Sequence, residues 1–98
     1  MSMKFDVERI ISYWLESAEY DLKVAENLFI TGIYPYSLFF GHLAIEKLLK
    51  TLVVRDSKDH APHTHSLPLL ASKIALKIPE AIERKLAAFM EFYFEATT

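Results

Sequence analysis

The sequence predicts an all-α fold, and three observations support this class. Apolar residues recur at helical spacing from Val7 to Ile30, and a strongly apolar stretch without proline follows from Ser37 to Arg55. Proline, glycine and polar residues separate these stretches and recur after residue 55. The chain contains no alternating strand pattern and no repeat. We therefore expect an up-and-down bundle of four helices whose first two form a long antiparallel pair.

The first predicted helix is Val7–Ile30. Its apolar residues step by four and three along one seam, and charged residues occupy the other side. Asp6 is the expected N-cap, and Glu19 precedes Lys23 by four positions, which favours an ion pair. Asp21 lies beside the seam, where a position at the helix edge explains it most simply. The seam consists of Ile11, Leu15, Ala18, Leu22, Ala25 and Phe29.

The segment 31–36 ends this helix. Gly32 suits a left-handed conformation after a helix, and Pro35 prevents continuation. Ser37 is a candidate cap of the next helix, with Pro35 or Tyr36 as alternative starting points.

The central helix, Ser37–Arg55, is apolar on almost all sides, so we expect neighbouring helices to cover it. Its polar residues fall three or four positions apart and predict a single polar strip facing solvent. The members of this strip are His42, Glu46, Lys47 and Lys50.

A polar loop, 56–65, precedes the last two predicted helices. Ser66 is the expected cap of a short third helix, with Pro68 in its first turn. Pro79, Glu80 and Glu83 predict the start of a fourth helix. The expected buried residues are Leu67, Leu70 and Ile74, with Leu69 and Ala71 as further candidates, in the third helix, and Ile82, Leu86, Phe89, Met90 and Tyr93 in the fourth.

Length and composition indicate a single domain that forms a dimer. The 98 residues suit one domain, residues 1–98, but 52% of them are apolar, more than so short a chain buries easily, so we expect a homodimer. Phe92 and Phe94 lie off the predicted face, which indicates cover by a partner or a chain that continues beyond Thr98.

Charge and cysteine content limit the binding partners and the kinds of site that the chain can have. The net charge of −2 gives no general attraction to nucleic acid. The absence of cysteine excludes disulfides and thiolate metal sites and fits a cytoplasmic protein. No signal peptide and no stretch long enough to span a membrane is present.

Three groups of residues are candidates for chemistry. His60, His63 and His65 could share a metal ion, but they lie in a loop without a rigid element, and we expect no metal site. Arg55 and His60 have a spacing with which RNA can be cleaved without metal, since histidine moves a proton and arginine neutralises the phosphorane. Such a pair is common by chance, so both residues are weak catalytic candidates.

The predicted polar strip is the third group. It is either an ordinary solvated face or a shallow anion site in which two lysines attract phosphates and His42 offers a titratable donor. Thr64 and His65 could complete this site. Alternatively, Thr64 and Ser66 simply cap the third helix.

The order of several short motifs resembles the HEPN family (higher eukaryotes and prokaryotes nucleotide-binding domain), over roughly nine-tenths of the chain. These motifs are Trp14 with Ala18, Asp21-Leu22 and Ala25, then Gly32-x-Tyr34, His42-x-Ala44-x-Glu46-Lys47-x-x-Lys50 and Thr64-His65-x-Leu67. The resemblance implies a dimeric bundle of four or five helices. It also implies that the bundle binds nucleotide or RNA, or that it accompanies a minimal nucleotidyltransferase in a toxin–antitoxin-like pair. It implies that the binding residues are His42, Glu46, Lys47, Lys50, Thr64, His65 and Asp21.

The sequence departs from the family in two places. Small bacterial and archaeal members continue with an Arg-Tyr-Pro segment where this chain reaches Thr98, and the RNase motif of the family lies in the C-terminal part of the domain rather than at Arg55 and His60. Whether the protein is an enzyme therefore stays open. A metal-independent RNase and a purely structural interaction dimer are the alternatives, and we expect no cofactor.

Overall fold

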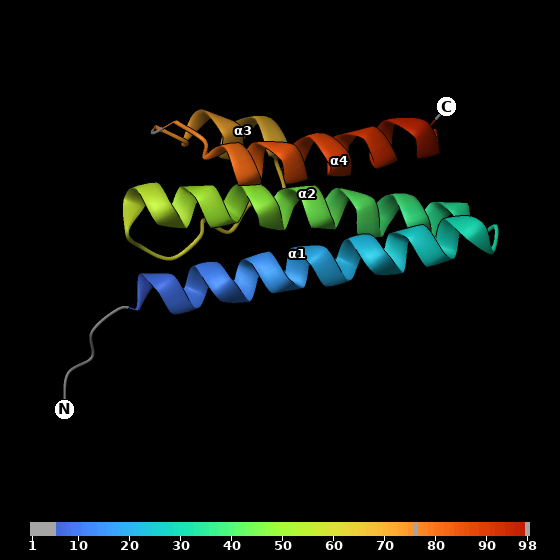
Figure 1. Ribbon diagram of the computed structural model, residues 1–98, viewed down its shortest axis with the longest axis horizontal. Helices are drawn as coiled ribbons and strands as arrows, with labels where there is room; N and C mark the ends of the chain where they lie inside the picture. The colour runs from blue at the N-terminus through green and yellow to red at the C-terminus, as the bar shows by residue number, and fades with distance from the viewer. Residues whose placement is uncertain (1–5, 76, 98) are drawn as a thin grey trace.

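The central element of the fold is the second helix, α2, which lies between α1 and the layer formed by α3 and α4 (Figure 1). The computed structural model describes residues 6–75 and 77–97, apart from the side chains of residues 93 and 95–97. Its helices are α1 (Val7–Ile30), α2 (Tyr34–Ser57), α3 (Leu67–Ser72) and α4 (Glu80–Thr97). The predicted all-α class and the long antiparallel first pair are confirmed, with four helices in the described residues.

The start and end of α1 follow the sequence prediction. Asp6 is the N-cap, and its Oδ1 accepts a hydrogen bond from the backbone N–H of Arg9 at 3.1 Å. Gly32 adopts a left-handed φ of 82° after the helix. The predicted pairing of Glu19 with Lys23 is wrong, since Glu19 binds Lys85 of α4 at 2.7 Å. Packing of α4 against α1 supplies this cation from outside the helix.

The ends of α2 differ from the prediction. The helix begins at Tyr34 with Pro35 in its first turn, where the missing N–H and fixed φ of proline are tolerated. Ser37 is therefore not the N-cap. Its buried hydroxyl instead donates to the carbonyl oxygen of Ala25 at 2.7 Å and ties α2 to α1. At the other end the helix continues past Arg55 to Ser57, and Lys58 ends it with a left-handed φ of 58°.

The hydrophobic core confirms that neighbours cover most of α2. Ala18 and Ala25 of α1 are fully buried, and their small side chains let the two helices approach closely. The covering ends near the start of α2, where Tyr34, Tyr36 and Phe39 remain exposed. The buried core cluster consists of Ala18, Ala44, Ile45, Leu48, Leu49, Val53, Leu70 and Phe89.

The two C-terminal helices are shorter, and their packing was predicted in part. Ser66 caps α3, as expected, by accepting from the backbone N–H of Leu69 at 3.2 Å. Leu70 is buried, but the proposed burial of Leu69 and Ala71 is wrong because both face solvent. Six residues make less than two turns, so one side chain of α3 is fully buried.

In α4, Ile82, Leu86 and Phe89 pack on the core as predicted, whereas Met90 is exposed. Phe92 is not left uncovered, because its ring meets that of Phe29 of α1 with centroids 6.1 Å apart. Phe94 is exposed. The predicted packing of Tyr93 lies outside the side chains that the structure describes.

Candidate functional site

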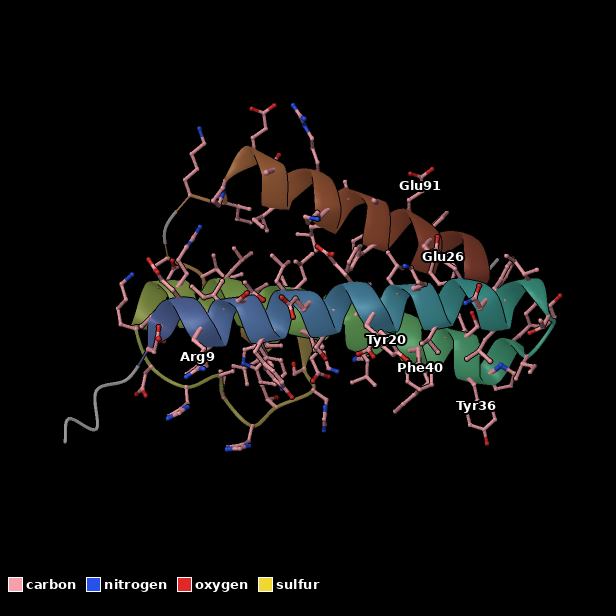
Figure 2. All side chains as sticks on the ribbon, turned by 60° about the horizontal axis from the view of Figure 1, so that its bottom comes forward. Arg9, Tyr20, Glu26, Tyr36, Phe40 and Glu91 are labelled. Carbon is pink, nitrogen blue, oxygen red and sulfur yellow. The ribbon has the colours of Figure 1, made fainter. Side chains whose placement is uncertain are left out.

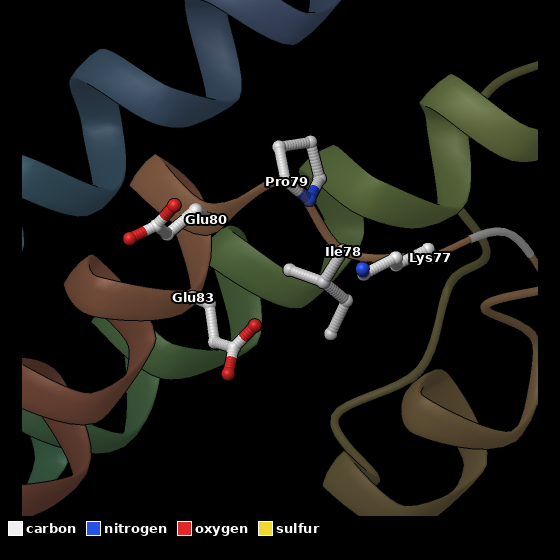
Figure 3. Close-up of a pocket in the computed structure, with 5 residues that line it drawn as sticks. All are labelled: Lys77, Ile78, Pro79, Glu80 and Glu83. Atoms are coloured by element: carbon white, nitrogen blue, oxygen red, sulfur yellow. The ribbon is translucent and has the colours of Figure 1, made fainter.

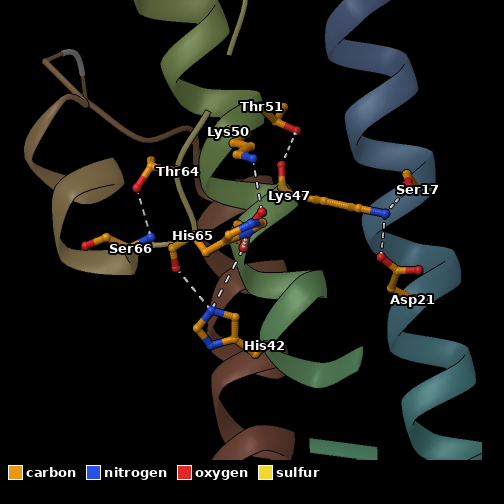
Figure 4. A network of polar contacts seen from close by, with 10 residues as sticks. Ser17, Asp21, His42, Lys47, Lys50, Thr51, Thr64, His65 and Ser66 are labelled. Atoms are coloured by element: carbon orange, nitrogen blue, oxygen red, sulfur yellow. Dashed lines mark hydrogen bonds and ion pairs between the residues drawn. The ribbon is translucent and has the colours of Figure 1, made fainter. Parts of the chain in front are cut away.

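Glu46 of α2 is the centre of a group of polar contacts (Figure 4). Lys50, one turn further along the helix, donates to Glu46 Oε2 at 3.0 Å. His65, from the α2–α3 loop (residues 58–66), donates from Nδ1 to Glu46 Oε1 at 2.9 Å. His42 Nε2 lies 3.9 Å from the same oxygen and 3.2 Å from the carbonyl oxygen of His65. A carboxylate only accepts hydrogen bonds, so Nδ1 of His65 carries a proton.

Burial distinguishes the members of this group. Glu46 is 2% exposed and Lys50 is 7% exposed, so the prediction that both belong to a solvent-facing strip is wrong. The reason is tertiary: His65 reaches over Glu46 from the loop, and Trp14 of α1 lies with its ring centroid 5.2 Å from Lys50 Nζ. By contrast, the His65 side chain is 83% exposed and forms the surface above the buried pair.

Lys47 points to the other side, toward α1 (Figure 4). Its Nζ lies 2.7 Å from Asp21 Oδ2 and 2.7 Å from Ser17 Oγ. Asp21 is buried, so the interpretation of this residue as an ordinary helix edge is wrong. We use the term polar network for these contacts, whose members are Ser17, Asp21, His42, Glu46, Lys47, Lys50 and His65.

The charges of the polar network balance. Burial alone would raise the pKa of the Glu46 carboxyl, but hydrogen bonds from His65 and Lys50 and the nearby positive charge lower it below its ordinary value of 4.5. Glu46 is therefore ionised at neutral pH and neutralises Lys50, as Asp21 neutralises Lys47. The network can hold charged groups in fixed positions inside the fold.

A comparison with known protein families finds a match. The HEPN domain family matches residues 11–97, which includes every member of the polar network. The chain belongs to the HEPN domain family. HEPN domains are a family of nucleotide-binding modules. No curated protein and no solved structure matches the chain.

Thr64, which the resemblance also implies as a binding residue, has a local role. Thr64 Oγ1 accepts from the backbone N–H of Ser66 at 3.1 Å and shapes the turn before α3. This contact agrees with the capping alternative, whereas the neighbouring His65 extends into the polar network. Of the two residues in the Thr64-His65 motif, only His65 has its side chain in the network.

Arg55 and His60, the weak catalytic candidates, lie apart from the polar network of this HEPN domain. Arg55 donates from Nε to Asp56 Oδ1 at 2.7 Å and from Nη1 to the carbonyl oxygen of Lys77 at 3.1 Å. Asp56 Oδ2 accepts from the backbone N–H of Ala75 at 2.7 Å. Together these contacts fasten the segment between α3 and α4 to the end of α2. His60 is exposed and lines a separate pocket with Val53, Ser57, Asp59, Pro62 and Lys73.

Another pocket lies where the chain enters α4 (Figure 3). Lys77, Ile78, Pro79, Glu80 and Glu83 line it, and Glu80 pairs with Arg84 at 2.6 Å. None of the predicted site residues lies there. Among the side chains that the structure describes, no group of three or more histidine, aspartate or glutamate residues could hold a metal ion. No described helix is long and apolar enough to cross a membrane.

Sequence reasoning missed two members of the site region, Ser17 and Trp14. Ser17 precedes Asp21 by four residues, so the two share one face of α1, and this spacing was the available signal. Trp14 precedes Ser17 by three residues and continues that face. The face of α1 that carries these three residues meets the polar side of α2.

Proposed function

We propose that this HEPN domain is a binding module for a nucleotide or RNA, with the ligand seated on the surface that His42 and His65 form over Glu46. The observation that carries the proposal is the contact between His65 and Glu46, because it holds an exposed imidazole on a buried carboxylate. An imidazole in this position can donate to a phosphate oxygen and can stack on a base. Membership of a nucleotide-binding family supports the ligand class.

Two lysines of the polar network also suit a phosphate. Lys47 retains 20% exposure of its side chain, and Lys50 lies one helical turn away on the same helix. Both are held on α2, the helix that contacts every other helix, so little ordering remains to be done on binding. We therefore assign His42, Glu46, Lys47, Lys50, His65 and Asp21 to the site, with Thr64 shaping the loop that carries His65.

Calorimetric titration with ADP and with a short single-stranded RNA tests this function. We expect His65→Ala and Lys47→Ala to weaken binding, and Lys47→Ala to reduce the dependence of affinity on salt by about one released ion. Lys85→Ala is the matched control, because it removes a lysine from the exposed ion pair with Glu19. Absence of binding at millimolar ligand, both by the wild type and by variants that lack the charge of Asp21 or Glu46, would contradict the proposal. Cleavage of the RNA in EDTA, abolished by a histidine substitution, would favour the RNase alternative.

A second observation favours self-association. Figure 2 shows Tyr20, Phe40 and Tyr36 along one edge of the α1–α2 pair, on the side away from α4. A pocket on this face is lined by Pro35, Tyr36, Phe39 and Phe40. Tyr36 is 64% exposed and Phe39 58% exposed. A face that carries both an apolar pocket and projecting aromatic rings can pack against its own copy about a two-fold axis.

We propose a homodimer through this face. Light scattering after gel filtration should give twice the mass of the chain for the wild type, and Phe39→Glu should give the monomer. Met90→Glu places the same charge at an exposed apolar position of α4 and should leave the dimer intact. A monomeric wild type would contradict the homodimer. A mixed complex with a minimal nucleotidyltransferase, the partner that the family resemblance implies, would then be the outcome to examine by co-purification.

A further inference from the structure

The cations of the polar network are already neutralised inside the fold. Lys47 Nζ lies 2.7 Å from Asp21, and Lys50 Nζ lies 3.0 Å from Glu46. Both carboxylates are buried, whereas the carboxylates of the Lys85–Glu19 and Arg84–Glu80 pairs are exposed. Each of the two ammonium groups therefore has its charge compensated at short range, that of Lys47 on the side of α1 and that of Lys50 beside Glu46.

We propose that Asp21 and Glu46 are built-in competitors of the phosphate, so that the ligand binds only when a lysine exchanges its carboxylate partner for a phosphate oxygen. This inference rests on the proposed function and concerns the control of the same site. Two features of the geometry support an exchange: one ammonium group is partly accessible, and the carboxylate that neutralises the other is shared with a side chain that can turn.

Lys47 is the accessible ammonium group. Its side chain is partly exposed, and the hydroxyl of Ser17, 2.7 Å from Nζ, is a neutral partner that remains when Asp21 is displaced. The long lysine side chain can swing toward solvent without a change in the backbone. Exchange at Lys47 therefore requires only the loss of its contact with Asp21.

Lys50 is the covered ammonium group. Its Nζ is bound to Oε2 of the same Glu46 carboxylate whose Oε1 accepts a hydrogen bond from His65. Because most of the His65 ring is in water, the ring can leave Glu46 and turn toward a phosphate that enters beside it. Lys50 therefore exchanges after His65 has moved, and Lys47 exchanges first.

The proposal makes a prediction opposite to the usual effect of changing a binding site. Asp21→Asn keeps the shape of the side chain and removes its charge, so it should raise the affinity for ADP by about tenfold, because a neighbouring charge at contact distance is removed. Glu46→Gln keeps an oxygen that can accept a hydrogen bond from His65 Nδ1 and removes the negative charge beside Lys50, so it should act in the same direction there. Glu19→Gln changes the net charge by the same amount outside the polar network and should alter the affinity less than about twofold.

Titration of the wild type and these variants with ADP at one ionic strength tests the inference. Lys47→Met combined with Asp21→Asn should lose the gain in affinity, which assigns the gain to Lys47. Circular dichroism establishes that each variant is folded, and Glu46→Gln serves as the second probe if Asp21→Asn does not fold.

The outcomes separate this inference from the function on which it rests. Tighter binding by Asp21→Asn or Glu46→Gln, including binding by a variant when the wild type shows none, supports the competition. Binding by the wild type with equal or weaker binding by both variants overturns the competition and leaves the proposed function intact. No binding by the wild type or any variant overturns both.

Discussion

Ser37 Oγ donates a hydrogen bond to the carbonyl oxygen of Ala25 at 2.7 Å, and both residues are buried between α1 and α2. The contact joins two helices that otherwise meet through apolar side chains. It also fixes how far α2 is displaced along α1, and hence which residues of the two helices face each other.

Ser37→Ala should therefore lower the free energy of unfolding by about 1–2 kcal/mol, the usual effect of losing a buried hydrogen bond. Urea denaturation followed by circular dichroism measures this change. Ser12→Ala, at an exposed position of α1, is the control and should change stability by less than about 0.5 kcal/mol. Equal effects of the two substitutions would show that the contact with Ala25 is unimportant.

Glu46 should make stability depend on pH in the acid range. Its pKa in the folded protein lies below 4.5, so its contribution is complete above about pH 4.5 and is lost as the pH falls through the folded-state pKa. Glu46→Gln leaves the buried Lys50 without its counter-charge and should cost roughly 3 kcal/mol at pH 6. The difference between the two proteins should shrink between pH 5 and pH 3.

Urea denaturation at several pH values measures this difference. Glu19→Gln, in a half-exposed ion pair, should behave almost like the wild type over the same range. A difference between wild type and Glu46→Gln that stays constant down to pH 3 would be incompatible with a stabilising carboxylate at this position.

Asp56 should be important for holding the end of α2 to the segment before α4. Its two oxygens accept from Arg55 at 2.7 Å and from the backbone N–H of Ala75 at 2.7 Å. Asp56→Ala should destabilise the protein by about 1.5–3 kcal/mol, since both bonds involve a charged acceptor. Arg84→Ala breaks the exposed pair with Glu80 and should cost less than about 0.5 kcal/mol. Thermal unfolding compares the two, and a reversed order would contradict this interpretation.

Two left-handed positions should respond oppositely to substitution. Gly32 has a φ of 82°, so Gly32→Ala should destabilise the protein by about 1–2 kcal/mol, although no atom within 4 Å would clash with the added methyl group. Lys58 has a φ of 58°, so Lys58→Gly should relieve strain and be neutral or stabilising by up to about 1 kcal/mol. Denaturation midpoints of the two variants test the signs, and a destabilising Lys58→Gly would contradict the second.

Local sequence signals predicted the helices because each signal acts within one turn. Asp6, Gly32 and Ser66 have the conformations and cap contacts expected of them. Ser37 was wrongly predicted to be an N-cap. Its side chain binds the carbonyl oxygen of Ala25, twelve residues away, and a local sequence pattern does not show a contact over that distance. The end of α2 was placed two residues early for a similar reason, since Asp56 is held by Ala75.

The candidate site was predicted as a set of residues, but its burial was not. Helical spacing brought His42, Glu46 and Lys50 to one side of α2, and the structure joins them through Glu46. Their exposure depends on the α2–α3 loop and on α1. The apolar pattern of one helix does not show where these other segments lie. The partners Asp21 and His65 lie 26 and 19 residues from Lys47 and Glu46, respectively, so these contacts required the tertiary structure.

The position of Trp14 over Lys50 provides an intrinsic optical reporter. The chain has one tryptophan, and its ring centroid lies 5.2 Å from the ammonium group of Lys50. An indole is sensitive to a charge at that distance, so movement of Lys50 should change the emission spectrum. Occupancy of the buried half of the site can therefore be followed by fluorescence in the unlabelled protein.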